Sequence, residues 1–290
     1  MSERRFRFGL VAAPNLSGDE WIGLARRAES LGYDTLLLPD VPEMGSPFPA
    51  AGVAAGATTT LRVGTFVVVA PVRTPASIAA ESTTLDRLTG GRFELGLGTG
   101  RPGAERLAAQ LGTELPPAAE RVRRVAATVE AVRAAGAART PGAARTPGAA
   151  RTPGAGPRIL IAGAGPKILA VAARLADTIT LALPPSADEN ALREVLAPLE
   201  DLAGDRFAQI ELSLNLAAVG EKPVPELERW LGGTPAELAA RGAIGVLTGS
   251  RAEMADRLAR RRDELGISYI AANAAAIDDL APVVERLAGT

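Results

Sequence analysis

Residues 61–101 constrain the fold of this chain more than any other part of the sequence. An apolar run covers Val63–Ala70, a helix-like pattern follows over Pro75–Leu88, and a second apolar run covers Phe93–Leu97. Two continuous apolar strands joined by a helix of this length are typical of a right-handed βαβ unit. The parallel sheet of such a unit is covered on both faces.

The second apolar run leads into a glycine-rich loop, Gly98-Thr99-Gly100. Glycine allows a ligand to approach the backbone closely, and the N–H groups of such a loop can contact an anion. We therefore expect a cofactor or a substrate phosphate at the carboxyl end of this strand.

Strand and helix patterns alternate along the whole chain. The predicted strands lie near residues 6–12, 34–38, 61–69, 92–98, 158–162, 178–182, 208–217 and 267–271. The predicted helices lie near residues 19–31, 75–89, 118–135, 165–176, 188–203, 225–240, 251–265 and 276–288. Eight strands with intervening helices favour a closed (β/α)8 TIM barrel over an open Rossmann sheet. The 290 residues suit one such domain, with short additions, over residues 1–290.

The sequence AARTPG occurs three times in succession, at residues 137–142, 143–148 and 149–154. A repeat of six residues that contains Pro and Gly buries almost nothing and favours neither a helix nor a strand. We interpret residues 137–156 as a flexible linker on the barrel face opposite the active site.

The composition excludes several classes of chemistry. The chain has no cysteine and no histidine, which excludes catalytic triads, thiol nucleophiles, disulfides and metal sites built on those residues. We therefore expect no metal, and an enzyme of this composition would depend on a cofactor for its chemistry. The net charge of −1 gives no indication of a nucleic-acid partner, and no apolar run is long enough to span a membrane. A cytoplasmic location is the default expectation.

Five segments, in a fixed order, resemble one known family. They are GYDTLLLPD, GTFVVVAPVRTP, RFELGLGTG, ILIAGAGPKILAVAARLAD and GVLTGSRAEMADRLARRRDELGISYI. Together they resemble the luciferase-like monooxygenase superfamily, and within it the branch of deazaflavin (coenzyme F420)-dependent oxidoreductases. The resemblance spans most of the chain and implies a TIM barrel that binds its cofactor at the carboxyl ends of the strands.

The resemblance also implies which residues contact the cofactor. Phe66-Val67 occupies the position of a non-prolyl cis peptide whose bulge presses against the central ring of the flavin. Thr99 and Gly100 match a loop that contacts the cofactor. The segment Gly163-Ala164-Gly165-Pro166 matches the phosphate-binding position, and its own sequence independently indicates an anion site at a helix start.

The residue that transfers a proton is harder to assign. Relatives often carry an Asp-His pair at the end of the second strand, but this chain reads Asp40-Val41. Asp40 and Glu43 lie just past that strand, so they are the candidate catalytic acids or bases.

We therefore expect an oxidoreductase that transfers a hydride between coenzyme F420 and a hydrophobic organic substrate. One alternative is a luciferase-like monooxygenase that uses reduced FMN, and another is a non-catalytic flavin-binding barrel. The expected partner is a small-molecule substrate, with a homodimer left open.

Overall fold

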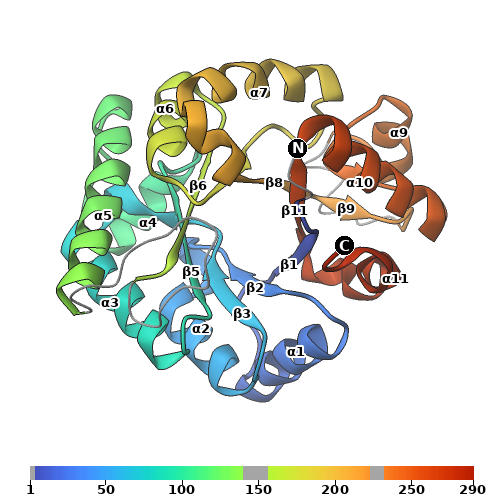
Figure 1. Ribbon diagram of the computed structural model, residues 1–290. Coiled ribbons are helices and arrows are strands. Elements are labelled where there is room, and N and C mark those ends of the chain that lie inside the picture. Colours follow the sequence, from blue (N-terminus) through green and yellow to red (C-terminus); the bar gives the residue numbers. More distant parts are fainter. Residues whose placement is uncertain (1–3, 140–155, 223–231) are drawn as a thin grey trace.

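The computed structural model describes residues 4–139, 156–222 and 232–290. Its core is a closed barrel of eight parallel strands surrounded by helices (Figure 1). The barrel strands are β1 (Arg7–Val11), β2 (Thr35–Leu38), β3 (Arg62–Thr65) with its continuation β4 (Val68–Val69), β5 (Phe93–Gly98), β6 (Arg158–Gly163), β7 (Thr178–Leu181), β8 (Glu211–Leu216) and β11 (Ile267–Asn273). Pairing between β3 and β5 closes the ring, which confirms the predicted (β/α)8 barrel.

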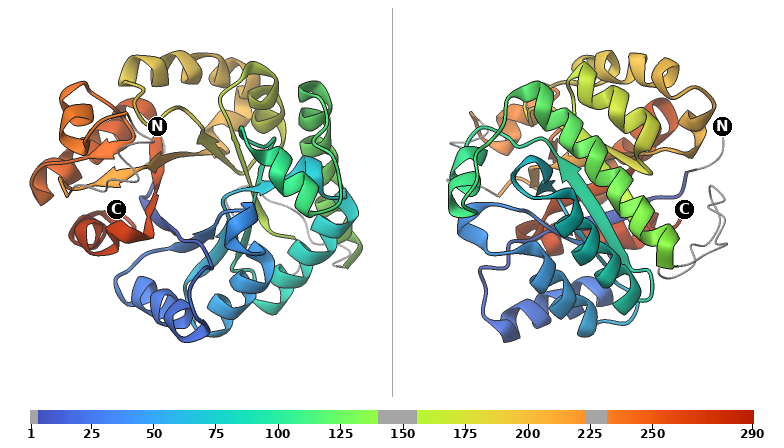
Figure 2. Two further views of the ribbon diagram at one scale, coloured as in Figure 1. Left: turned by 180° about the vertical axis from the view of Figure 1, so that it is seen from behind. Right: turned by 90° about the vertical axis from the view of Figure 1, so that its left-hand side faces the viewer.

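Helices cover the outside of the barrel, as both views in Figure 2 show. They are α1 (Gly18–Ser30), α2 (Pro47–Gly56), α3 (Pro75–Leu88), α4 (Ala104–Gln110), α5 (Ala118–Arg139), α6 (Pro166–Leu175), α7 (Glu189–Ala203), α9 (Pro235–Ala240), α10 (Arg251–Leu265) and α11 (Ile277–Leu287). Local sequence sets several helix starts: Ser17 and Ser250 each form a capping box with the glutamate three residues later.

The predicted linker begins later than the repeat suggests. Helix α5 continues through Ala137, Ala138 and Arg139, which are the first three residues of the first AARTPG copy. The expectation that the repeat holds no helix is therefore wrong for these three residues. Residues 140–155 lie outside the described part of the chain.

A two-stranded sheet supplements the barrel. It pairs β9 (Ala218–Val219) with β10 (Val246–Leu247), in parallel. The segment before β10 is tied to the loop after β7, because the Ile244 N–H donates to the Ala187 carbonyl at 2.7 Å. The sequence patterns did not predict this small sheet, since each of its strands has only two residues.

Buried charges close the amino-terminal end of the barrel, which we call the floor. The Glu94 carboxylate accepts a hydrogen bond from Arg7 at 2.6 Å and another from Arg62. Arg7 also donates to Glu211 at 2.9 Å, and its guanidinium lies 4.4 Å from the ring centroid of Tyr269. Burial alone would raise the pKa of Glu94, but Arg7, Arg62 and Arg158 lower it to about 2.

Candidate functional site

The opposite, carboxyl-terminal end of the barrel is the mouth, and its main feature is a break between β3 and β4. The two residues in the break, Phe66 and Val67, are joined by a cis peptide bond, as the resemblance implied. Both side chains are partly buried and pack on an interior cluster that includes Leu37, Leu160 and Tyr269. Phe66 and Val67 therefore present apolar surface at the mouth, above a filled interior.

Glycines of β5 make room for this break. A Cβ atom at Gly98 would lie 2.6 Å from Cγ2 of Val67, and one at Gly96 would lie 2.0 Å from the carbonyl oxygen of Thr65. A larger residue at Gly96 would strike the backbone at the end of β3, and one at Gly98 would displace the Val67 side chain. The GLG pattern thus provides the space that the bulge occupies, a role that the sequence reading had not assigned to Gly96.

Thr65 replaces the strand pairing that the break removes. Its hydroxyl donates to the Gly96 carbonyl at 2.8 Å and accepts from the Gly96 N–H at 2.9 Å. Both backbone groups of Gly96 are therefore satisfied, although the ladder is interrupted on either side. Sequence reasoning missed this residue, and a threonine at the end of an apolar strand gives little signal of the role.

Asp40 lies at the end of β2 and is engaged by β4 and the segment after it. Its carboxylate accepts two hydrogen bonds from Arg73, at 2.6 and 2.9 Å, and a third from the Val69 N–H at 3.1 Å. Burial raises the pKa of Asp40, and Arg73 and the Val69 N–H partly offset that effect. Because both oxygens are occupied, this geometry suits a group that positions β4. Its catalytic role stays a prediction.

The second predicted acid, Glu43, lies in a short 3-10 turn over Pro42–Met44. Its side chain falls outside what the structure describes, so the prediction for Glu43 is not tested.

The loop after β5 lies against the end of β4. Gly100 has a φ of +86°, a conformation that favours glycine, and a Cβ there would lie 3.2 Å from Cγ1 of Val69. Thr99 and Gly100 are both partly exposed. The structure therefore brings this predicted cofactor loop beside the strand that carries the bulge.

Arg121, in the first turn of α5, adds a cation to this loop. Its Nη1 donates to the Thr99 carbonyl at 3.5 Å, whereas its buried Nε has no hydrogen-bond partner in the described part of the chain. An unpaired buried donor is costly, so this position fits a site that receives a polar group. Sequence reasoning missed Arg121 because several arginines lie close together at the start of this helix.

The last predicted segment follows β6, the neighbour of β5 in the barrel. Gly165 is the N-cap of α6, without a side-chain hydrogen bond to the helix, and Pro166 occupies the first turn. A Cβ at Gly165 would meet no atom within 4 Å, whereas one at Gly163 would lie 2.4 Å from Ile168. Gly163 is therefore required for packing, Ala164 is partly exposed, and Gly165 leaves the helix start open to an anion.

These features together fit a flavin-type cofactor. The mouth offers an apolar wall of Val11, Phe66, Val67 and Ala162, an adjacent glycine loop and an uncapped helix start one strand away. Within the described residues there is no cluster of three acidic side chains that could hold a metal ion, and no helix is long and apolar enough to cross a membrane.

Comparison with known proteins gives a family match and distant structural neighbours. The model of the family described as "Luciferase-like monooxygenase" matches residues 6–221. The 4-hydroxyprotoasukamycin monooxygenase of Streptomyces nodosus subsp. asukaensis is 37% identical over 92 residues, which are 30% of this chain and 25% of that protein. The aligned segment thus spans about a quarter of this curated relative.

Two solved structures share the fold over nearly the whole chain. A riboflavin lyase, solved with modified FMN and riboflavin, has a TM-score of 0.73 at 17% identity, covering 98% of this chain and 93% of the other. The coenzyme F420 dependent tetrahydromethanopterin reductase of Methanopyrus kandleri has a TM-score of 0.72 at 15% identity, covering 98% and 100%. At such identities the likeness concerns the fold alone.

Proposed function

This chain belongs to the luciferase-like monooxygenase family, and from that premise we propose that it transfers a hydride between coenzyme F420 and an organic substrate. The observation that carries the proposal is the fit between Phe66-Val67 and β5 at the barrel mouth, where Gly96 and Gly98 accommodate the bulge. The similarity of the two segments, GTFVVVAPVRTP and RFELGLGTG, to the deazaflavin branch supports this cofactor.

In the proposed complex, the deazaflavin supplies the carbon that accepts or donates the hydride. Phe66 and Val67 form the surface against which the planar ring lies, and the apolar wall of the mouth excludes water from it. Holding ring and substrate in contact lowers the entropic part of the barrier, which is the protein's main contribution.

The polar end of the cofactor is assigned to the two neighbouring loops. The N–H groups at the start of α6 have no side-chain cap, so they are available to a phosphate oxygen. Arg121 and Thr99 lie at the loop after β5 and add a positive charge and a hydroxyl group. Each charge-assisted hydrogen bond of this kind contributes about 1.5–3 kcal/mol.

The protein's part in proton transfer is small in this proposal. With no histidine in the chain and with Asp40 held by Arg73, the substrate exchanges its proton with water unless Glu43 takes part. The apolar mouth supports a hydrophobic organic substrate, as we expect from the sequence.

A second candidate is a monooxygenase that uses reduced FMN. Its support is the sequence relative at 37% identity, which is named a monooxygenase. The fold suits both cofactors, because the structural neighbours include an F420-dependent enzyme and a protein solved with modified FMN.

A titration with each cofactor separately, followed by absorbance, tests the proposal. We expect F420 to bind more tightly than FMN or FAD, and bound F420 to be reduced or oxidised by a suitable substrate. Micromolar binding of FMN without binding of F420 would promote the monooxygenase. Binding without turnover across a broad panel of alcohols, aldehydes and enones would favour the non-catalytic flavin-binding barrel.

A further inference from the structure

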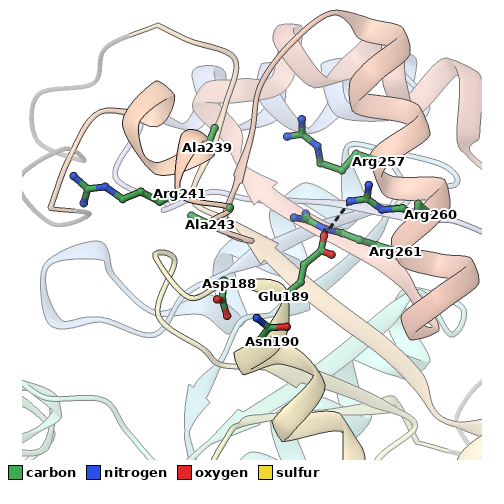
Figure 3. A pocket seen from close by; sticks show the side chains of 10 residues that line it. Asp188, Glu189, Asn190, Ala239, Arg241, Ala243, Arg257, Arg260 and Arg261 are labelled. Carbon is green, nitrogen blue, oxygen red and sulfur yellow. Dashed lines mark hydrogen bonds and ion pairs between the residues drawn. The ribbon is translucent and has the colours of Figure 1, made fainter.

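A pocket lies outside the barrel, between the start of α7, the end of α9 and the middle of α10 (Figure 3). Its volume is about 360 Å³. The charged residues in its lining are Asp188, Glu189, Arg241, Arg257, Arg260 and Arg261. Four arginines against two carboxylates leave this pocket with a net charge of +2, although the whole chain has a net charge of −1.

Three of these arginines lie on one face of α10. Arg257 lies three residues before Arg260 and four residues before Arg261, so its side chain neighbours both of theirs on the helix surface. Arg261 is buried, with 3% exposure. Burial lowers the pKa of Arg261, the hydrogen bond and the charge of Glu189 partly offset that effect, and the like charges of Arg257 and Arg260 lower the pKa further. Like charges at these spacings destabilise a helix, and an anion bound beside them would relieve that repulsion.

The acidic residues of the pocket are already occupied. Oε1 of Glu189 accepts from Nε of Arg261 at 3.1 Å and from Nη2 of Arg260 at 3.2 Å, the latter drawn as a dashed line in Figure 3. The Asp188 carboxylate caps α7 by accepting from the Ala191 N–H at 2.9 Å. Glu189 is therefore shared by Arg260 and Arg261, and Asp188 forms no ion pair with an arginine in the described ranges.

Arg257 and Arg241 form no ion pair with any residue in the described ranges. The acid one turn before each of them, Glu253 and Glu237 respectively, accepts hydrogen bonds from the residue that caps its own helix. Those hydrogen bonds lower the pKa of each acid, and the charge of the nearby arginine lowers it further. Arg241 is exposed at the rim, and Arg257 is partly buried on the α10 side. The pocket therefore keeps two guanidinium groups whose donors are available.

We propose that this pocket binds a small polyanion, a molecule that carries two or more negative charges on phosphate or carboxylate groups. The planar fork of Arg257 and the free donors of Arg260 match the oxygen pairs of either group. The Arg261–Glu189 pair forms the fixed base of the site, and Arg241 lies at its exposed rim.

The position of the pocket gives the bound anion a structural consequence. The segment before β10 contacts the loop after β7 through the Ile244–Ala187 hydrogen bond and through the Gly245 N–H, which donates to the Pro185 carbonyl at 3.1 Å. The pocket is lined by Gly242 and Ala243 of this segment as well as by α10, so a bound anion would brace the same contact from the outside. The site is separate from the proposed cofactor residues, so it does not depend on the proposed function.

Isothermal titration with inorganic pyrophosphate and, separately, with citrate tests the proposal and distinguishes phosphate from carboxylate recognition. The protein carries Gly165→Val in all titrations, which removes the helix start of α6 as a competing phosphate site. We expect one saturable site for at least one probe. Arg257→Gln and Arg260→Gln should each raise its Kd at least about tenfold.

The matched control is Arg251→Gln, which removes the same charge from an exposed position on the same helix, away from the pocket. Its Kd should stay within about twofold of the parent value. The absence of saturable binding for both probes would overturn the proposal. Equal losses in Arg251→Gln and Arg257→Gln would also overturn it, because they would show attraction to net charge without a site.

Discussion

The two ends of the barrel differ in the residues that form them: paired charges at the floor, and apolar side chains and glycines at the mouth. At the floor, Glu94 is 2% exposed and shared between Arg7 and Arg62, and Tyr269 fills the space above Arg7. At the mouth, Phe66 and Val67 are partly exposed and backed by glycines. Buried, paired charge fixes the floor, whereas the mouth leaves apolar surface and backbone N–H groups open to a ligand. A substitution at the floor should therefore lower the free energy of unfolding, and a substitution at the mouth should weaken the binding of the cofactor.

The largest expected effect is at the floor. Glu94→Gln leaves Arg7 and Arg62 without the carboxylate they share, and an unbalanced buried charge costs about 3–5 kcal/mol. Urea unfolding should show this loss in the free energy of unfolding. The control Glu264→Gln breaks an exposed pair with Arg193 and should cost no more than about 1 kcal/mol. Equal losses in both variants would contradict the assignment of Glu94 to the stability of the floor.

The acid dependence of stability follows from the same residue. Glu94 has a pKa of about 2 in the folded protein, against an ordinary value of 4.5. The folded state therefore binds fewer protons than the unfolded state, and the contribution of Glu94 is present above pH 4.5 and is lost as the pH falls through 2. The free energy of unfolding should fall by about 3 kcal/mol across this window. Glu94→Gln should lack this component; an unchanged acid profile in that variant would show that another group is responsible.

Asp40 shares features of both ends, since it is buried like the floor residues but lies at the mouth. Asp40→Asn weakens the pair with Arg73 and the contact to the Val69 N–H, so we expect a loss of about 2–3 kcal/mol in stability and a weaker cofactor affinity. Arg73→Gln should give the same pair of changes, and the double variant should be far from additive. Preserved affinity with hydride transfer slowed about a hundredfold in single turnovers would instead make Asp40 a proton-transfer group.

Gly98→Ala tests whether Val67, at the mouth, forms part of the surface that contacts the cofactor. The added methyl group would meet Val67, and such overpacking costs about 1–3 kcal/mol, here at the low end because Val67 is partly exposed and can move. Displacing Val67 should raise the Kd for the cofactor about tenfold. Gly23→Ala is the control, because Gly23 is an exposed glycine in α1 with open space around it, and the change should be neutral or stabilising. Unchanged affinity in Gly98→Ala would place the ring elsewhere.

The sequence predicts the barrel well because its strands are buried on both faces. All eight predicted strands appear within three residues of their observed ends, since continuous apolar runs such as Leu36–Leu38 are informative on their own. The break at Phe66-Val67 was found only through the family resemblance, because an apolar pair in a strand carries no local signal of it.

The floor could not be predicted in the same way. Glu94 interrupts an apolar run, and its partner Arg7 lies 87 residues away, so the pair is visible only once the barrel closes. Arg121 is similar: its position beside Thr99 depends on how α5 packs against α3. Residues whose role comes from ring closure or helix docking are thus the ones that sequence reasoning missed.

The central claim is that the floor determines stability and the mouth determines cofactor binding. Measuring the melting temperature and the cofactor affinity together in Gly165→Val tests it most directly. Gly165 has no neighbour for a new side chain to strike, so the melting temperature should change little. A β-branched side chain at the helix start should obstruct the approach of a phosphate to the N–H groups and raise the Kd for F420 by about tenfold or more. A fall in melting temperature that matches the loss of affinity, or an unchanged affinity, would contradict the account.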